Sequence, residues 1–444
     1  MKKAIQVFIN KTKSRDSIVS RSFTALFFSF LGAGCSKLCI MAMNVILSRL
    51  LGVEVYGQYS TVYSTIQTFV TFSSGGVGAS MVRYTAMYRK KDKRACGQII
   101  STLFFVCLIL CIVLVSTLYV FSDPISNLVS GEGGLSLYLR ISAVVILLVA
   151  VSSILQNVLV GFEKFKSSTF IDIICGIASI LFVTGFTYFM GIVGALIGLI
   201  LARLFTGILF LITTMRVMRE ESIPITVRFN EIVKEPIFKF TIPSFIAAIS
   251  VVPITFVANA MLVRNAGYVD MAIYNVAAQW VAIIAYITIL FTKVKPIYID
   301  LLDKEDIKGF ASLVKKMVLL STLCGSLISF VLICLARPIL SIYGDGYQGG
   351  RIVYIIMISS AILISTQSQF GAVLEALGKM RIGMVLNLIW GFNLLSIFYL
   401  LIDKGALGYS IAYFGSYALH CLYSWLIVFY EFKKLKSVKK RYKF

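Results

Sequence analysis

Apolar runs of about 20 residues recur along almost the whole chain, and a run of that length crosses the ~30 Å hydrocarbon layer of a membrane as a helix. This feature restricts the possible folds more than any other. Hydrophobic residues make up 59% of the 444 residues and charged residues only 14%, whereas about a quarter of residues are charged in soluble proteins. Continuous runs favour helices over the alternating strands of a membrane barrel. The sequence predicts an all-α membrane protein with twelve spans, at residues 23–47, 59–82, 98–121, 137–161, 170–190, 192–215, 241–263, 272–292, 313–336, 352–376, 383–402 and 406–430.

Lysine and arginine are distributed very unequally between the breaks that separate these runs. Of the 42 cations, 34 lie at the two termini or in breaks after even-numbered spans. Because cations are retained on the cytoplasmic side of a membrane, both termini are predicted to be cytoplasmic. The net charge of +22 is then a sign of topology, not of a nucleic-acid partner. Two cations, Lys37 and Arg203, lie inside spans, and six face the external side: Arg49, Arg140, Arg264, Arg337, Arg351 and Lys404.

The motifs of common enzymes and metal proteins are absent from the sequence. The nine cysteines form no C-x-x-C pair, and one histidine cannot complete a local Cys/His metal site. There is no phosphate-binding loop and no H-E-x-x-H. The breaks between spans are too short to fold as a catalytic domain. We therefore expect no enzymatic activity, no cofactor and no metal.

Two stretches of the first half recur in the second half at the same offset of 215 residues, and a Gly-Ala-Leu at 194–196 recurs at 405–407 with an offset of 211. This pattern predicts two six-helix lobes, residues 1–222 and 223–444, joined by a cytoplasmic linker at about 216–239. Because each half has an even number of spans, the repeats are parallel, as in transporters whose halves rock around a central site. The pairs at offset 215 are Asn44 and Asn259, Leu47 and Leu262, Arg49 and Arg264, Gly52 and Gly267, Tyr59 and Tyr274, Val158 and Val373, Leu159 and Leu374, Lys164 and Lys379, and Lys166 and Arg381.

Polar residues inside the spans are candidates for a substrate site. A cation at mid-span costs roughly 2.5–3.5 kcal/mol unless it faces protein or water, and no acid lies in the central turns to neutralise Lys37 or Arg203. We expect these two cations to line a wet cavity for an anion; pairing with backbone carbonyls or with a distant acid is the alternative. Further candidates are Asn44, Gln67, Arg83, Asn275 and Gln279, which could instead pack helices together, and Arg49 and Arg264, which could line the external mouth or simply snorkel to the interface.

Three motifs at helix ends resemble those of one transporter family. Leu47-Ser48-Arg49-Leu50-Leu51-Gly52, followed by Tyr56-Gly57-Gln58-Tyr59, is similar to the motif after the first helix of polysaccharide flippases in the multidrug/oligosaccharidyl-lipid/polysaccharide exporter superfamily. Residues 270–277 and 405–412 resemble the second-lobe and last-helix motifs of that family. The resemblance covers essentially the whole chain and is closest to the O-antigen branch.

The resemblance implies two six-helix lobes, alternating access, and transfer of a polyprenyl-diphosphate-linked oligosaccharide of O-antigen or capsule type to the outer leaflet of a bacterial inner membrane. Membrane lipids, a glycan polymerase machinery and H⁺ or Na⁺ as coupling ion are the expected partners. Asp172 and Glu375 are the acids that enter spans, so they are the candidate coupling-ion ligands; a helix-end role is the alternative. A cation-coupled drug exporter of the same superfamily is the alternative function, which the central positive charges disfavour.

Overall fold

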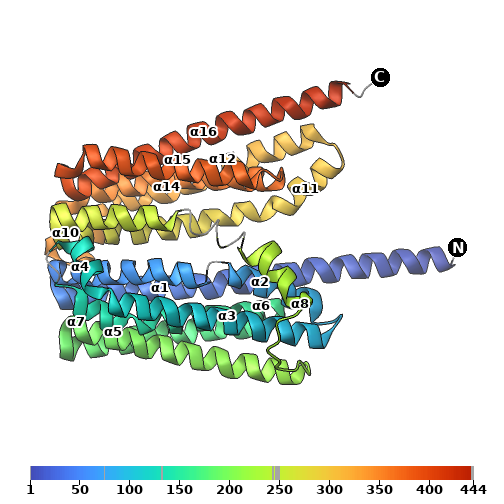
Figure 1. Cartoon of the computed structure of the whole chain (residues 1–444). Helices are drawn as coiled ribbons and strands as arrows, with labels where there is room; N and C mark the ends of the chain where they lie inside the picture. Colours follow the sequence, from blue (N-terminus) through green and yellow to red (C-terminus); the bar gives the residue numbers. More distant parts are fainter. Residues whose placement is uncertain (1, 75, 132–133, 243–244, 246–250, 442–444) are drawn as a thin grey trace. The chain divides into compact units, whose positions relative to one another are not determined.

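The computed structural model describes residues 2–74, 76–131, 134–242, 245 and 251–441, and the regular structure of these residues is helical (Figure 1). The elements are α1 (Lys2–Ser74), α2 (Val77–Tyr88), α3 (Lys93–Val120), α4 (Ser122–Ser130), α5 (Ser136–Ser142), α6 (Val144–Gly161), α7 (Phe165–Glu220), α8 (Glu231–Pro236), η1 (Ile237–Thr241), α10 (Val252–Thr288), η2 (Ile289–Val294), α11 (Lys295–Asp303), α12 (Ile307–Cys334), α13 (Ala336–Tyr343), η3 (Asp345–Gly350), α14 (Arg351–Ala376), α15 (Met380–Leu400), η4 (Ile402–Lys404) and α16 (Gly405–Arg441).

Nine helical segments of the described residues are long and apolar enough to cross a membrane, so the predicted all-α membrane fold is confirmed. Three of them are much longer than the others, with 44 residues in Phe30–Ser73, 56 in Phe165–Glu220 and 52 in Val252–Asp303. One crossing needs only about 20 residues, so each of these segments is long enough for two. The predicted span at 241–263 lies partly outside the described residues.

Each of the three long segments is interrupted by one glycine with non-helical backbone angles. The (φ, ψ) pairs are 75° and 167° at Gly52, 57° and −136° at Gly191, and 83° and −175° at Gly267. A positive φ is easily adopted only by glycine, so these positions require that residue. In α7 the two arms pack side by side in opposite directions, since Gly194 and Gly198 of the second arm lie against Phe186 and Phe182 of the first.

The backbone conformation repeats together with the sequence. Gly52 and Gly267, an offset of 215 apart, have nearly the same angles. Glu163 and Gly378, also 215 apart, both have a positive φ, 61° and 69°. In both places the following lysine N–H donates to the carbonyl five residues earlier, which is the Schellman arrangement at the end of a helix. The internal repeat is thus a repeat of backbone structure.

The structure corrects the register of the repeat near the end of each half. Gly191 and Gly405 share an unusual conformation, with φ 57° and ψ −136° in one and φ 54° and ψ −131° in the other. Gly194 and Gly408 each lie against a backbone carbonyl of the preceding helical arm. Both pairs are 214 residues apart, so the Gly-Ala-Leu match at an offset of 211 was misaligned by three residues. Residues that are equivalent in the two halves of the repeat are therefore identified here by their backbone angles and not by the sequence of a short motif.

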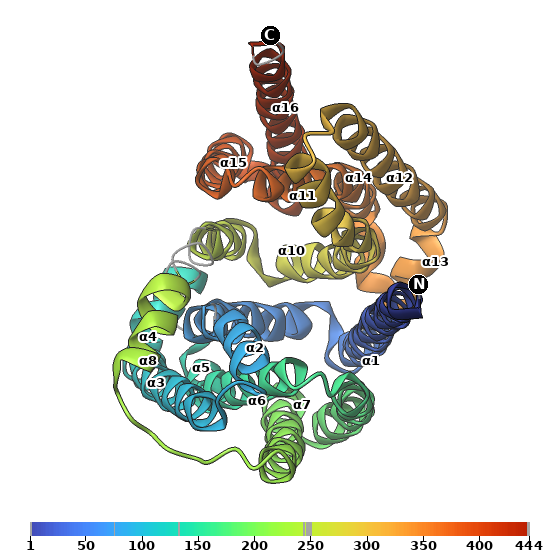
Figure 2. The same cartoon turned by 90° about the vertical axis from the view of Figure 1, so that its right-hand side faces the viewer.

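The described chain forms two compact units. The first comprises Met1–Asn44, Phe69–Thr117 and Ile141–Ile246, and the second comprises Val45–Thr68, Leu118–Arg140 and Ala247–Phe444. In the first unit, side chains of α2, α3, α6 and α7 share one apolar core. In the second, α11, α12, α14, α15 and α16 do the same, and Figures 1 and 2 show α14, α15 and α16 side by side. The division into lobes at residue 222 stays a prediction.

The segment after α7, which belongs to the predicted linker, is attached to α3 within the first unit. The Thr102 hydroxyl lies 3.2 Å from the backbone nitrogen and 3.3 Å from the backbone oxygen of Arg228. The Asn230 side-chain amide donates to Gln98 at 3.0 Å. These contacts hold the middle of the predicted linker against the first spanning residues of α3.

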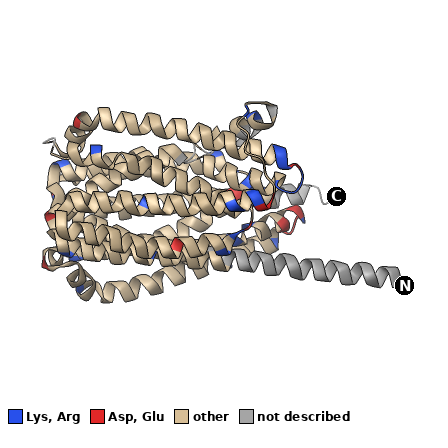
Figure 3. Ribbon diagram, turned by 90° about the horizontal axis from the view of Figure 1, so that it is seen from below, with Lys and Arg blue, Asp and Glu red and all other residues tan. Residues whose placement is uncertain are grey.

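Charged residues gather at the ends of the helices, and the middles of the helices hold few of them (Figure 3). The ion pairs follow this distribution. Arg89 pairs with Glu163 in the first unit, and Lys379 lies 3.5 Å from Glu431 in the second. Ions at the helix ends stay within reach of water or lipid headgroups, where their hydration is retained.

The last hairpin of the chain offers a direct test of the topology. Lys404 lies in the turn before α16, and the 37 residues of α16 are enough for one crossing. Reporter fusions at Lys404 and after Lys436 should therefore read out on opposite sides of the membrane, with the second in the cytoplasm. A readout on the same side would contradict the predicted topology.

Candidate functional site

Helix α7 packs closely on the turn of α1 that contains Lys37. A Cβ atom at Gly176 would lie 3.0 Å from the Cβ of Cys39 and 3.7 Å from the Cα of Ser36. Small residues allow two membrane helices to approach this closely. Lys37 itself is half-buried, so a positive charge is placed beside the contact between α1 and α7.

Arg203 lies on the second arm of α7 at the same depth of the first unit. Cys175, the neighbour of Gly176, is within electrostatic range of both Arg203 and Asp172. The Arg203 side chain is half-buried, and its Nε is buried without a hydrogen-bond acceptor in the described part of the chain. A guanidinium group has five N–H donors, and a buried donor without an acceptor is costly. We refer to Lys37 and Arg203 as the cationic layer, and the Nε of Arg203 is a buried donor without an acceptor in the described residues.

Asp172 lies near this cationic layer and is held by an amide, not by a cation. Gln156 of α6 donates through Nε2 to the two carboxylate oxygens, at 3.0 and 2.9 Å, and lies 3.3 Å from the Ser168 hydroxyl. Gly32 of α1 leaves room for the carboxylate, because a Cβ there would lie 3.3 Å from Asp172 Oδ2. Asp172 makes no salt bridge within the described residues. A half-buried carboxylate with only an amide partner is suited to bind a proton or a small cation.

The other two candidate residues of the first unit are less central. Asn44 is buried on α1. Arg83 on α2 is exposed, and its guanidinium carbon lies 5.9 Å from the ring centroid of Tyr84, within the range of a cation–π contact.

Asn275 and Gln279 form one hydrogen-bonded group in the second unit. Gln279 Nε2 donates to Asn275 Oδ1 and to the hydroxyl of Tyr56, each at 2.9 Å. The spacing of four residues on α10 makes the first contact possible, since residues i and i+4 share a helix face. Gln67, also assigned to this unit, is half-buried on the second arm of α1.

The two predicted external arginines and Glu375 are exposed in the second unit. Arg49 donates from Nε to the carbonyl of Ile342 at 2.6 Å and from Nη2 to that of Ser341 at 3.0 Å. Glu375 forms an ion pair with Lys295. The structure thus gives Arg49 and Glu375 partners within the second unit.

Aromatic side chains that the sequence did not single out pack together in the second unit. The ring centroids of Tyr274 and Tyr409 lie 4.3 Å apart, and those of Tyr409 and Phe398 lie 4.8 Å apart. Trp390 and Tyr417 continue this packing at 5.1 Å. The high content of aromatic residues, 13%, was a signal for such packing but did not identify its members.

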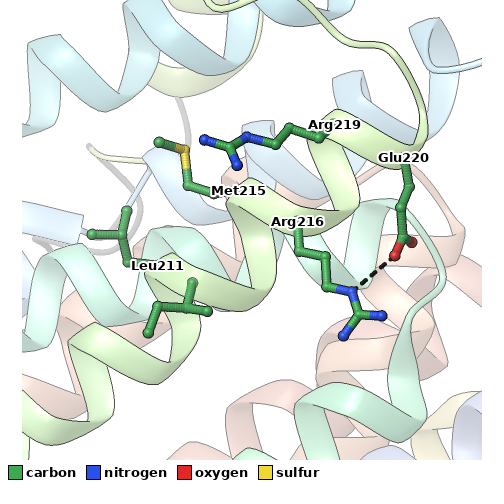
Figure 4. A pocket seen from close by; sticks show the side chains of 6 residues that line it. Leu211, Met215, Arg216, Arg219 and Glu220 are labelled. Carbon is green, nitrogen blue, oxygen red and sulfur yellow. Dashed lines mark hydrogen bonds and ion pairs between the residues drawn. The ribbon is translucent and has the colours of Figure 1, made fainter.

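A pocket of about 490 Å³ lies at the end of α7 (Figure 4). Its six lining residues all come from this one helix, and Arg216 pairs with Glu220 at 3.0 Å on its wall. A pocket formed by one helix is a surface groove. It contains none of the predicted substrate-binding residues, so it is not the site that the sequence predicted. Its lining residues are Leu211, Ile212, Met215, Arg216, Arg219 and Glu220.

The fold is that of transporters of the MOP superfamily. An inward-facing multidrug resistance transporter of the MATE family is 14% identical and superimposes with a TM-score of 0.80, covering 90% of this chain and 96% of that one. The lipid II flippase MurJ in an inward closed conformation is 16% identical, with a TM-score of 0.70 and coverage of 92% and 90%. A MOP superfamily transporter from Pyrococcus furiosus is 14% identical, with a TM-score of 0.65 and coverage of 92% and 95%. No curated protein sequence matches the chain.

These observations define a multi-pass membrane protein with the fold of MOP superfamily transporters. The chain belongs to the polysaccharide biosynthesis protein family, which it matches over residues 25–301. This range is more than half of the chain. The resemblance stated from the helix-end motifs is therefore confirmed.

Proposed function

We propose that the protein is a flippase that moves polyprenyl-diphosphate-linked oligosaccharide repeat units, of O-antigen or capsule type, from the cytoplasmic to the outer leaflet of the bacterial inner membrane. Membership in the polysaccharide biosynthesis family and a fold similar to that of the lipid II flippase support the proposal. The observation that carries it is the buried, unpaired Nε of Arg203 at the depth of Lys37.

The transport cycle that we propose uses twelve crossings in two parallel lobes, residues 1–222 and 223–444, with both termini in the cytoplasm. Each of the three long helices would cross twice, with its glycine at the turn. The two lobes would expose a common site alternately to the two sides of the membrane.

The chemistry of the substrate explains why this site needs cations. A diphosphate carries at least two negative charges, and its hydration makes unaided passage through hydrocarbon costly. Lys37 and Arg203 replace part of that hydration with charge-assisted hydrogen bonds. Asn44, Gln67, Asn275, Gln279 and the exposed Arg83 offer further polar groups to the phosphates or the sugars. The polyprenyl chain can stay in the lipid while the head crosses.

The proposed transport cycle also needs a residue that binds the coupling ion. Asp172 is the preferred ligand for H⁺ or Na⁺, because it is half-buried and its hydrogen-bond partner is the amide of Gln156. Glu375 is a weaker candidate, since it is exposed and paired with Lys295. We further propose that a glycan polymerase receives the exported unit.

Removing a cation of the cationic layer should reduce transport without preventing insertion. A hydrogen bond to a charged group contributes about 1.5–3 kcal/mol, so Lys37→Ala and Arg203→Ala should each lower the rate of glycan export by roughly ten- to a hundredfold. Lys37→Arg should keep part of the activity, because it keeps the charge. The measurement is the amount of surface glycan, normalised to the amount of protein in the membrane.

Arg216→Ala is the matched control for the variants Lys37→Ala and Arg203→Ala. Arg216 is an exposed arginine of the same helix as Arg203, and it already pairs with Glu220. Surface glycan should be unchanged in this variant. If Arg216→Ala and Arg203→Ala reduce export equally, the specific role of the cationic layer is refuted.

Neutralising Asp172 should change the ion dependence of transport. Asp172→Asn preserves the size of the side chain and a hydrogen bond to Gln156, but it cannot carry the charge that binds a cation. We expect glycan export in this variant to lose its dependence on the imposed H⁺ or Na⁺ gradient. Export that still follows the gradient as in the parent protein would exclude Asp172 as the coupling site, and Glu375→Gln serves as the comparison.

Deletion of the gene distinguishes the proposed flippase from the alternatives. The lipid-linked repeat unit should still be assembled but should accumulate on the cytoplasmic leaflet. A drug exporter would leave the glycan unchanged and increase sensitivity to cationic dyes. Normal appearance of the unit on the outer leaflet, in a strain without a second flippase, would refute the proposed function.

A further inference from the structure

Helix α13 ends with carbonyl groups that are satisfied by a distant part of the chain. The last carbonyls of a helix have no partner inside the helix. Here the Ser48 hydroxyl donates to the carbonyl of Tyr343 at 3.0 Å, and the Arg49 guanidinium donates to those of Ile342 and Ser341. Ser48 and Arg49 therefore cap three of the last four carbonyls of α13, across almost 300 residues of sequence.

The charge of Arg49 fits this position. The C-terminal end of a helix carries a partial negative charge, which a cation stabilises. The last turn of α13 has no basic residue of its own. The planar guanidinium can donate hydrogen bonds to two carbonyls from two separate N–H groups. An ammonium group cannot donate with the same geometry.

The chain packs tightly around this cap. A Cβ at Gly346 would lie 3.2 Å from the Cβ of Val53. Gly57 lies directly against the backbone carbonyl of Tyr268 and has no room for a side chain. The ring centroids of Tyr56 and Tyr347 lie 6.3 Å apart. All these residues belong to the second unit, yet residues 45–68 come from the first half of the internal repeat.

The repeat shows a reciprocal contact at the equivalent position. Arg264, which corresponds to Arg49, lies beside Gly131, where a Cβ would be 3.8 Å from the Arg264 Cγ. Gly131 is the C-terminal cap of α4, as Gly344 is of α13, and both glycines have a positive φ. Each arginine thus meets the end of a short helix that belongs to the other half of the repeat.

We propose that Ser48 and Arg49, with the carbonyls of Ser341, Ile342 and Tyr343, form an external latch whose opening is a step of transport. The inference rests on the proposed function. The latch joins the two halves of the repeat on the side that the cation distribution predicts to be external. A substrate that leaves toward the outer leaflet requires the halves to separate there. The two carbonyls that accept from Arg49 are neutral and exposed, so water can replace these bonds when the latch opens, whereas the bond from Ser48 to the carbonyl of Tyr343 is buried. Arg49 is then a gating residue and not a ligand of the substrate.

A reversible cross-link tests whether the latch must open. In a variant whose nine native cysteines are replaced, Val53→Cys and Gly346→Cys place two Cβ atoms close to the 3.5–4.5 Å of a typical disulfide. The matched control is Gly325→Cys with Ser365→Cys, at a Cβ separation of 3.0 Å, because both residues lie in the second half of the repeat. Copper-phenanthroline oxidises either pair. Export is measured in a deletion strain as radiolabelled glucose that reaches surface glycan within a short pulse.

Oxidation should reduce export at least tenfold in the Val53/Gly346 pair, and dithiothreitol should restore it, whereas the control pair should export normally in both states. Arg49→Ala in the same background should slow formation of the first cross-link severalfold, and Arg49→Lys should slow it less. A fully formed Val53/Gly346 cross-link with unchanged export would overturn the latch. That result would leave the flippase proposal intact, because the latter fails only if the reduced protein does not restore export to the deletion strain.

Discussion

A backbone in hydrocarbon must satisfy its own hydrogen bonds, because no water is present to replace them. Four helix ends show how the structure follows this constraint. At Glu163 and Gly378 the chain leaves the helix with a positive φ, and the next N–H returns to a carbonyl of the last turn. At the start of α16 the side chain of Asp270 accepts from the Ala406 N–H at 2.6 Å. At α13 the required donors come from Ser48 and Arg49.

The same environment makes charges inside the membrane informative. A cation or an acid within a span is retained only where protein, water or a ligand compensates it. In one unit of the molecule, Asp172 is compensated by the amide of Gln156, whereas the Nε of Arg203 has no acceptor within the described residues. Arg49, which looked equally suitable in the sequence, uses its charge at the end of a helix instead. The position of an ion along its helix therefore decides whether it can bind the end of a neighbouring helix or must be compensated inside a span.

Much of the fold could be predicted from the sequence because its signals are local. The length of an apolar run and the charge of a break are properties of neighbouring residues, and they led to the all-α membrane class, while short motifs at helix ends led to the family. The equivalence of Gly52 and Gly267 was also visible, since the surrounding residues match. The equivalence of Gly191 and Gly405 was missed, because the short Gly-Ala-Leu match favoured a neighbouring glycine and only the backbone angles reveal the correct pair.

The sequence by itself determined that the chain is a helical membrane protein with an internal repeat and with cations at mid-span. Hydrophobicity and charge decide which segments enter the membrane, and this choice does not depend on tertiary contacts. Only the tertiary structure decided which polar groups meet. The sequence did not identify Gln156 as a candidate, but in the structure its amide donates to the carboxylate of Asp172. The sequence placed Tyr56 only in a family motif, but in the structure its hydroxyl accepts a hydrogen bond from Gln279. Arg49 and α13 are almost 300 residues apart, and no local pattern records their contact. Hydrogen bonds and close packing depend on distances of a few ångströms between distant segments, and those distances exist only once the helices have packed.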